Sequence, residues 1–300
     1  MREIDAAVVH GPEEHAVETV TLDDPKSGEV LVDVRATGVC HTDYHAYTSD
    51  DTDFPLVLGH EGAGVVEAVG DGVSTVEPGD RVVLWVLPSC GDCEYCRSGR
   101  PYLCQARRET RGRMMDGTRR LGQDGDPIDH FYAQSSFASM AVVPERQVVP
   151  VPDDVPFEIG ALLGCGVTTG LGAVSNIADV DGGESVAVFG CGGVGAGAVL
   201  AADAVSAGTV IAVDLDSDTL ETMAEIGATH TIDAGDADPV AEIEALTDGG
   251  DYAFECIGTP QTVQQAIASL APGGTAAITG TSSTPPAEID LGRFTTGISV

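Results

Sequence analysis

Four cysteines within one short segment have the spacing of a zinc site. Thiolates separated by two residues can turn their sulfur atoms toward one centre, and four of them complete a closed tetrahedral shell with no position left for a substrate. These residues are Cys90, Cys93, Cys96 and Cys104. We therefore predict a structural zinc site here, with an iron–sulfur site or reduced thiols as the alternatives.

A second group of metal-binding residue types is spread along the chain, as catalytic metal ligands usually are. Cys40, His60 and Cys165 together would form a Cys2His shell, which leaves one zinc coordination position open for water or a substrate. Each residue alone also has an ordinary explanation, because a lone cysteine is usually a small buried apolar side chain and a lone histidine is usually hydrogen-bonded.

A glycine-rich motif predicts a nucleotide site. The motif comprises Gly190, Gly192, Gly193, Val194 and Gly195. It lies between the apolar segment Ser185–Phe189 and an Ala-rich segment over 196–207, which places it at a strand-to-helix turn where a pyrophosphate can bind helix N–H groups. Asp214 follows at about the spacing of a carboxylate that binds the adenosine ribose and repels a 2′-phosphate, which favours NAD over NADP. A tight turn without a ligand is the alternative for the glycines alone.

Two different patterns of secondary structure must position these residues. Val-rich segments over 28–39, 56–69 and 80–87 are separated by Gly and Pro turns, so the first 152 residues are predicted to form a mostly β domain. After a predicted helix over 157–176, short β-rich segments alternate with helical ones, which predicts a doubly wound parallel sheet. The predicted strands are Ser185–Phe189 and residues 210–213, 229–232, 252–255 and 275–279.

The charge balance excludes one class of partner. The chain has 14 Lys+Arg and 48 Asp+Glu, a formal net charge of −34, whereas nucleic-acid binding needs a basic face. Such an acidic excess is typical of a halophilic protein, because concentrated salt screens the self-repulsion. Eight arginines lie within residues 97–120. We interpret them as a surface that pairs with the acidic remainder, with about 0–1 kcal/mol per exposed pair.

The sequence contains no apolar segment with the length of a membrane span. Its first residues lack the pattern of a secretion signal. We therefore predict a cytoplasmic protein. We expect it to bind a small-molecule substrate and not a membrane.

In their order and spacing, these motifs resemble the zinc-containing medium-chain alcohol dehydrogenases, in the branch that includes class I enzymes and glutathione-dependent formaldehyde dehydrogenases. The resemblance implies an N-terminal GroES-like β barrel domain with the structural zinc lobe over residues 1–152. It implies a Rossmann NAD-binding domain over residues 153–300, from which a C-terminal segment is missing. It also implies two zinc ions per chain, NAD and, if the chain is complete, a homodimer or homotetramer.

The resemblance assigns roles to the residues around both sites. Thr42 and His45 would pass the substrate proton to water, Asp43 would accept the ring N–H of His60, and Glu61 would lie behind the zinc. A surface histidine is the alternative for His45, and a solvated loop acid is the alternative for Asp43 and Glu61. The residues implied in coenzyme binding are His41, Thr169 and Val194, with the other glycine-motif residues and Asp214.

We therefore expect a zinc-dependent oxidoreductase that transfers hydride between a primary or secondary alcohol and NAD, giving an aldehyde or a ketone. One alternative is a formaldehyde or thiol-adduct dehydrogenase, because Arg108 matches an anion-contacting arginine of those enzymes. The other alternative is an inactive zinc- and nucleotide-binding protein, because the expected C-terminal segment is missing.

Overall fold

The computed structural model of the chain describes residues 1–281 and 286–300. The chain divides into two compact units, Met1–Cys165 and Gly166–Val300. Within the described part of the chain, no helix is both long enough and apolar enough to cross a bilayer.

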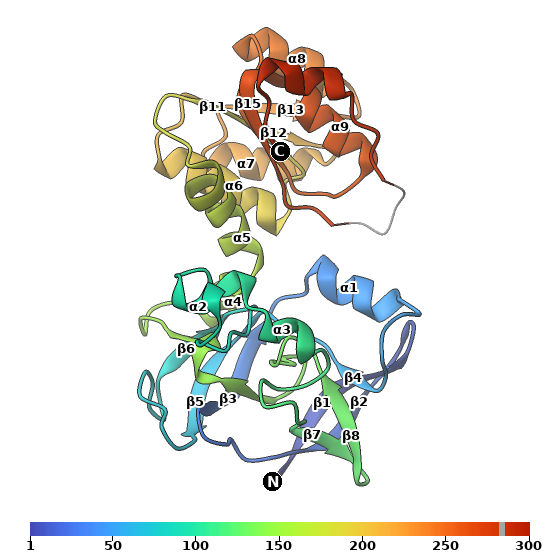
Figure 1. The fold of residues 1–300 in the computed structure, drawn as a ribbon, viewed down its shortest axis with the longest axis vertical. Coiled ribbons are helices and arrows are strands. Elements are labelled where there is room, and N and C mark those ends of the chain that lie inside the picture. Colours follow the sequence, from blue (N-terminus) through green and yellow to red (C-terminus); the bar gives the residue numbers. More distant parts are fainter. Residues whose placement is uncertain (282–285) are drawn as a thin grey trace. The chain divides into compact units, whose positions relative to one another are not determined.

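Unit 1 contains two β sheets (Figure 1). One is a closed barrel of β1 (Arg2–Gly11), β2 (Glu14–Leu22), β7 (Leu121–Gln123), β8 (Asp126–His130) and β4 (Leu56–Val57). The other has the order β10 (Val148–Pro150), β6 (Arg81–Leu84), β5 (Gly62–Val69), β3 (Glu29–Thr37) and β9 (Met140–Pro144). The Val-rich predicted segments are found in these strands, because their side chains fill the cores of both sheets.

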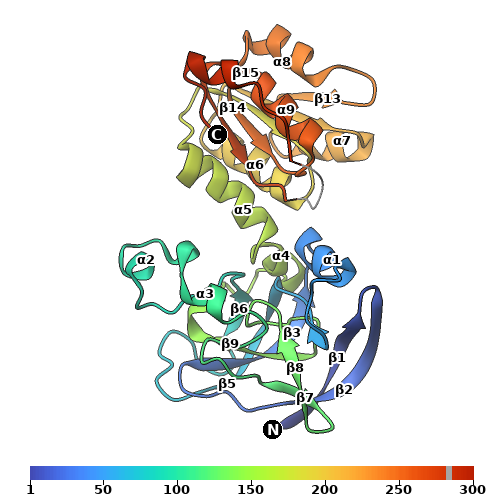
Figure 2. The same ribbon diagram turned by 45° about the vertical axis from the view of Figure 1, so that its right-hand side comes forward.

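Short helices join the strands of unit 1. They are α1 (His41–Thr48), α2 (Glu94–Arg97), η1 (Pro101–Leu103), α3 (Ala106–Glu109), η2 (Glu145–Gln147) and α4 (Phe157–Leu162). Figure 2 shows α2 in a lobe that projects from the strands, and this lobe carries the four closely spaced cysteines.

The single helix predicted over 157–176 is wrong. Helix α4 ends at Leu162, and α5 (Gly166–Gly172) begins only at Gly166 in unit 2. The intervening backbone packs against the end of β6, because Gly164 accepts a hydrogen bond from Val86 N–H and a Cβ on Gly164 would overlap the Leu84 carbonyl oxygen.

Helix α4 also explains where unit 1 ends. Phe157 and Ala161 pack with Ala63 and Val83 of the barrel domain, and the Arg81 guanidinium lies 3.7 Å from the centre of the Phe157 ring. The compact unit therefore extends past residue 152, where the sequence places the domain boundary, to Cys165.

Unit 2 is a parallel sheet in the order β13 (His230–Asp233), β12 (Thr209–Asp214), β11 (Ser185–Phe189), β14 (Gly250–Glu255) and β15 (Leu270–Ile278). Alternate side chains of β11 enter two different cores, with Val186 and Val188 on one face and Ala187 and Phe189 on the other. The doubly wound fold predicted from the sequence is confirmed. Ser299 makes a parallel bridge to Thr275, so the last described residues extend this sheet.

The helices of unit 2 cover both faces of the sheet. They are α5, the π-helix η3 (Ala173–Ala178), α6 (Gly193–Ala204), α7 (Ser217–Glu225), α8 (Pro239–Thr247), α9 (Pro260–Ala268) and the 3-10 helix η4 (Leu291–Thr296). The side chains of Asp216, Asp238 and Thr259 accept the first free N–H groups of α7, α8 and α9.

Candidate metal centres, coenzyme turn and pocket

The four cysteines of the projecting lobe gather their sulfur atoms into one cluster. All four Sγ atoms lie within 4.8 Å of one another, and Cys96 Sγ is 3.5 Å from Cys93 Sγ and 4.0 Å from Cys90 Sγ. Sulfur atoms around a tetrahedral zinc ion are about 3.8 Å apart. Backbone N–H groups of Cys96 and Gln105 lower the pKa of Cys93 to about 6, which favours the thiolate form that binds metal. The cluster therefore fits a structural zinc ion.

The widely spaced metal-binding residues also come together. Donor atoms of Cys40, His60, Glu61 and Cys165 all lie within 4.8 Å of one another. Cys40 precedes α1, His60 and Glu61 lie between β4 and β5, and Cys165 follows α4. A hydrogen bond with the Cys165 thiol lowers the pKa of Cys40 to about 3, with further lowering by His60 and Thr42 against the opposing effect of burial.

Asp43 holds two of these ligands in place. Its Oδ2 accepts the Cys40 backbone N–H at 3.0 Å, and its Oδ1 lies 3.1 Å from His60 Nδ1 and accepts Gly59 N–H at 2.9 Å. Because an ionised carboxylate can only accept, His60 donates from Nδ1 to Asp43, which leaves Nε2 as the ring nitrogen available to a metal ion. Asp43 is only 2% exposed, so it is not a solvated loop acid.

His60 provides the test of whether this cluster fits a metal ion. Its Nε2 is buried and has no hydrogen-bond partner among the residues that the structure describes. Burial opposes its charged form, but Asp43 and Cys40 outweigh burial and raise the pKa of His60 to about 9, so a metal ion that binds Nε2 would displace a proton. An orphaned imidazole nitrogen beside a cysteine thiolate and a buried carboxylate is the donor set of a zinc site.

Glu61 contributes the fourth donor, and a glycine makes room for it. The residue is 4% exposed, and a Cβ on Gly38 would overlap its carboxylate. Gly38 N–H also donates to the Glu61 carbonyl oxygen at 3.0 Å. Glu61 is therefore held at the metal cluster and is not a solvated loop acid.

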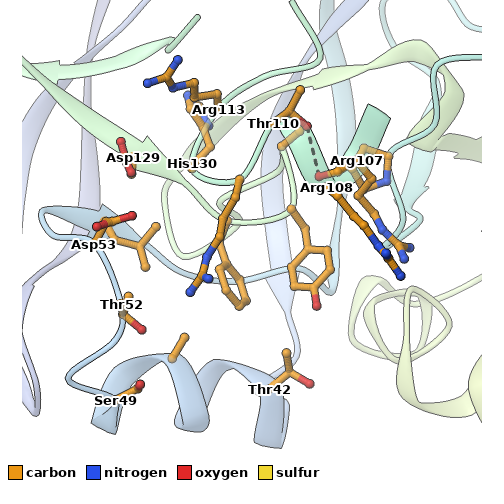
Figure 3. Close-up of a pocket in the computed structure, with 18 of the residues that line it drawn as sticks. Thr42, Ser49, Thr52, Asp53, Arg107, Arg108, Thr110, Arg113, Asp129 and His130 are labelled. Carbon is orange, nitrogen blue, oxygen red and sulfur yellow. Dashed lines mark hydrogen bonds between the residues drawn. The ribbon is translucent and has the colours of Figure 1, made fainter. Parts of the chain in front are cut away.

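A pocket of about 540 Å³ lies in unit 1 beside α1 (Figure 3). Thr42 and His45 line it from α1, where their spacing of three residues puts them on one face of the helix. Arginine side chains line it from the segment after Cys104, namely Arg107, Arg108, Arg111 and Arg113. None of these four makes an ion pair with a side chain in the described part of the protein. The pocket therefore offers positive charge to a ligand in a strongly acidic chain.

Two aromatic rings that the sequence analysis did not single out as site residues complete the metal site. Phe131 and Tyr132 lie with their ring centroids 5.6 Å and 5.3 Å from that of His60, and both line the pocket. Tyr132 has a φ of 52°, a left-handed conformation that is unusual for a residue with a side chain. The sequence carries no signal for this conformation, because glycine or asparagine would be expected there.

In unit 2, the glycine motif forms the predicted turn between β11 and α6. Gly190 has a φ of 87°, and a Cβ on Gly195 would overlap the Gly190 carbonyl oxygen. A Cβ on Gly192 or Gly193 would meet nothing within 4 Å, so the N-terminus of α6 is open to a ligand. Such an end fits the pyrophosphate of a dinucleotide.

Asp214 ends β12 beside this turn. Its Oδ2 accepts the Cys191 N–H at 2.7 Å, which fixes the carboxylate against the glycine motif. Val194 lies in the first turn of α6 and Thr169 lies on α5 of the same unit. His41 is the first residue of α1 in unit 1.

The interpretation of the arginine-rich segment as an exposed surface is wrong for Arg120. Its side chain is fully buried and forms ion pairs with Glu29 at 2.5 Å and Asp116 at 2.9 Å. Asp116 also binds Lys26 at 2.9 Å. The partners Glu29 and Arg120 are 91 residues apart, so sequence spacing gives no sign of the pair. The backbone N–H of Arg120 donates to His130 Nε2 at 2.9 Å.

This buried network predicts a loss of stability in acid. Burial, together with the positive charges of Arg120 and Arg119, lowers the pKa of His130 to about 3. Below the ordinary histidine pKa of about 6.5, the unfolded chain therefore binds a proton that the folded chain does not, which lowers the unfolding free energy by up to about 1.4 kcal/mol per pH unit. The unfolding free energy should keep falling until the pH reaches the pKa of His130 in the folded protein.

Asp116 adds to the same trend at lower pH. Burial raises its pKa, but hydrogen bonds from Thr118, Lys26 and Arg120 outweigh burial and lower it below the ordinary value. Its contribution is present above the unfolded pKa and is lost as the pH falls further. Urea unfolding between pH 7 and pH 4 measures the effect of His130, and urea unfolding below pH 4 adds that of Asp116. The pH dependence should weaken in His130→Gln and persist in a variant of the exposed histidine, His10→Gln.

The comparisons with known proteins agree with both halves of the structure. Residues 26–153 match the alcohol dehydrogenase GroES-like domain family, and residues 193–300 match the zinc-binding dehydrogenase family. The S-(hydroxymethyl)glutathione dehydrogenase of Escherichia coli O1:K1 is 43% identical over 310 residues, which cover 97% of this chain and 83% of the relative.

Two solved structures are similar over nearly the whole chain. An alcohol dehydrogenase zinc-binding domain protein from Burkholderia ambifaria has a TM-score of 0.94 and 40% identity, covering 99% of this chain and 83% of its own. Benzyl alcohol dehydrogenase from Acinetobacter calcoaceticus has a TM-score of 0.93 and 36% identity, covering 100% of this chain and 84% of its own.

Proposed function

The chain belongs to the zinc-containing medium-chain alcohol dehydrogenase family, and we propose that it oxidises a primary or secondary alcohol with NAD and binds two zinc ions per chain. The observation that carries the proposal is the cluster of Cys40, His60, Glu61 and Cys165, in which His60 and Glu61 are buried. When bound there, zinc supplies a Lewis acid for the alcohol oxygen, and the nicotinamide ring accepts the hydride.

The chain's own residues bind the groups and move the proton. Cys40, His60 and Cys165 hold the ion, and Asp43 keeps the His60 ring oriented. Thr42 Oγ1 would accept the proton of the substrate hydroxyl while it releases its own, and the His45 ring would take up a proton and release one to solvent, since both residues line the pocket on α1. We place the reaction in the cytoplasm, and assembly into a homodimer or homotetramer remains a prediction.

A substrate screen tests the proposal. Ethanol, longer alcohols, benzyl alcohol and polyols are each supplied with NAD in molar salt, and the formation of NADH is followed by its absorbance. We expect turnover with at least one class of alcohol and two zinc ions per chain by elemental analysis. Two zinc ions and intact NAD binding without turnover would instead identify an inactive zinc- and nucleotide-binding protein.

The choice of NAD depends on the Asp214 carboxylate, which would repel the 2′-phosphate of NADP. Replacing Asp214 with asparagine removes the charge and keeps one of the two oxygens that accept backbone N–H groups from Cys191 on one side and Leu215 on the other. We expect the ratio of kcat/KM for NADP to that for NAD to rise about tenfold or more, which corresponds to about 1.4 kcal/mol. Steady-state kinetics with both coenzymes measure it, and faster turnover of the unaltered protein with NADP would contradict the assignment.

A second candidate function is the oxidation of an anionic formaldehyde–thiol adduct. The unpaired arginines of the pocket favour it, and so does the similarity to S-(hydroxymethyl)glutathione dehydrogenases. If Arg108 contacts the anion, Arg108→Ala should raise KM for the formaldehyde–glutathione adduct about tenfold and leave the constants for ethanol unchanged. Arg100→Ala, which alters an arginine outside the pocket, is the matched control. Unchanged constants for every substrate would rule out this role of Arg108.

A further inference from the structure

A short segment after β8 departs from ordinary backbone conformation where it meets the metal centre. Tyr132, Ala133 and Ser135 have φ values of 52°, 53° and 57°. Residues with side chains rarely adopt this left-handed conformation, and several of them close together persist only where surrounding contacts enforce it. The segment is therefore held in place by other parts of the protein.

Hydrogen bonds tie this segment to the ligand-bearing backbone. Gln134 Oε1 accepts the Gly62 N–H at 2.9 Å, one residue after Glu61. Ser136 N–H donates to the Gly59 carbonyl oxygen at 3.1 Å, one residue before His60. The segment is therefore hydrogen-bonded to the backbone on both sides of His60 and Glu61.

Gln147 also holds this segment, through a hydrogen bond to the backbone of Tyr132. It is completely buried at the end of η2, and its side-chain Nε2 donates to the Tyr132 carbonyl oxygen at 3.0 Å and to the Trp85 carbonyl oxygen at 2.9 Å. Both amide hydrogens are thereby used. The Trp85 N–H donates in turn to the Gln147 carbonyl oxygen at 2.7 Å. Gln147 thus fixes the backbone of the residue whose ring packs on His60.

We propose that Gln147 is a positioning residue that sets the substrate specificity of the pocket: its buried amide holds Tyr132 in the left-handed conformation that places the ring against His60 and closes the pocket wall. Gln147 does not line the pocket, so it acts through Tyr132. This inference rests on the proposed function, because specificity is read from alcohol oxidation.

The test compares ethanol with benzyl alcohol in Gln147→Leu. Without the amide, the backbone of Tyr132 can move and its ring no longer fixes the pocket wall. A small alcohol should then lose its orientation more than a bulky alcohol, which still fills the pocket. We expect the ratio of kcat/KM for benzyl alcohol to that for ethanol to rise about tenfold, since displacements of about 1 Å have effects of this size or larger. Zinc content should stay unchanged. Gln147→Asn, whose amide is one methylene shorter, should shift the ratio in the same direction if the leucine variant does not fold.

A double-mutant cycle separates positioning from general destabilisation. Tyr132→Gly removes the ring and relaxes the backbone, so adding Gln147→Leu to it should change the ratio by less than about twofold. The control Gln123→Leu removes an amide that binds Glu18 outside the pocket, and it should leave the ratio unaltered. The proposal is overturned if Gln147→Leu shifts the kcat/KM ratio equally in the unaltered protein and in Tyr132→Gly, or shifts it in neither.

A measurement that needs no alcohol oxidation distinguishes a failure of the proposed function from a failure of the role proposed for Gln147. Trp85 is the only tryptophan of the chain and its backbone carbonyl accepts from Gln147, so fluorescence reports on the surroundings of this one indole beside the contact. Acrylamide should quench Trp85 more strongly in Gln147→Leu than in Gln123→Leu. Stronger quenching in a protein that oxidises no alcohol would contradict the proposed function and support the bridging role of Gln147; equal quenching would contradict that role.

Discussion

Replacing Cys165 with serine should abolish alcohol oxidation and leave one zinc ion per chain. Cys165 donates one of the two thiolates of the cluster, and a serine hydroxyl is a far weaker zinc ligand at neutral pH. Because the ion stabilises the developing negative charge by several kcal/mol, kcat/KM should fall by at least about 10³-fold. Steady-state kinetics together with elemental zinc analysis measure both changes.

The control for this variant lies in the projecting lobe. Cys93→Ser removes a ligand of the other cluster, so it should also lose one zinc ion but reduce mainly thermal stability. Cys191→Ser changes a buried cysteine of unit 2 that belongs to neither cluster, and it should keep both ions. Full activity of Cys165→Ser with two bound zinc ions would show that the cluster is not the catalytic metal site.

Replacing Arg120 with methionine should have the largest effect on folding. The guanidinium is fully buried between Glu29 and Asp116, and its loss leaves the Glu29 carboxylate buried without its partner. Breaking a buried ion pair in this way costs about 3–5 kcal/mol. Urea unfolding at neutral pH should show this decrease in the free energy of unfolding.

A matched arginine variant distinguishes burial from loss of charge. Arg97 pairs with Asp92 at 3.8 Å on the surface, with both side chains mostly exposed. Arg97→Met should therefore change the unfolding free energy by less than about 1 kcal/mol. Equal effects of the two variants would mean that the net charge of the chain, and not the buried network, determines its stability.

The sequence predicted those parts of the site that depend on local spacing. The lobe cysteines are close in the chain, and the glycine motif lies between a strand and a helix that each have their own pattern, so short-range rules suffice. Cys40, His60 and Cys165 are far apart, so their residue types and the family resemblance could only suggest a shared site, and the structure places their donor atoms together.

The remaining features depend on contacts between distant segments. Glu29 begins β3 and Arg120 directly precedes β7, so the two meet only in the folded unit, and a charge pattern cannot distinguish a buried arginine from a surface one. The break between α4 and α5 likewise follows from the close approach of Gly164 to Leu84 of β6, which overrides helix propensity. The left-handed Tyr132 is imposed by hydrogen bonds from residues elsewhere in the chain, including Gln147.

The most direct test of the central claim is the fate of the hydrogen on the substrate carbon. An alcohol that is oxidised in the screen is prepared with deuterium at the carbinol carbon and incubated with the protein and NAD, and the reduced coenzyme is analysed by mass spectrometry. We predict that the nicotinamide ring carries the deuterium, and that Cys165→Ser forms no labelled coenzyme. Reduced coenzyme without the label, or equal labelling by the variant, would contradict zinc-dependent hydride transfer at this site.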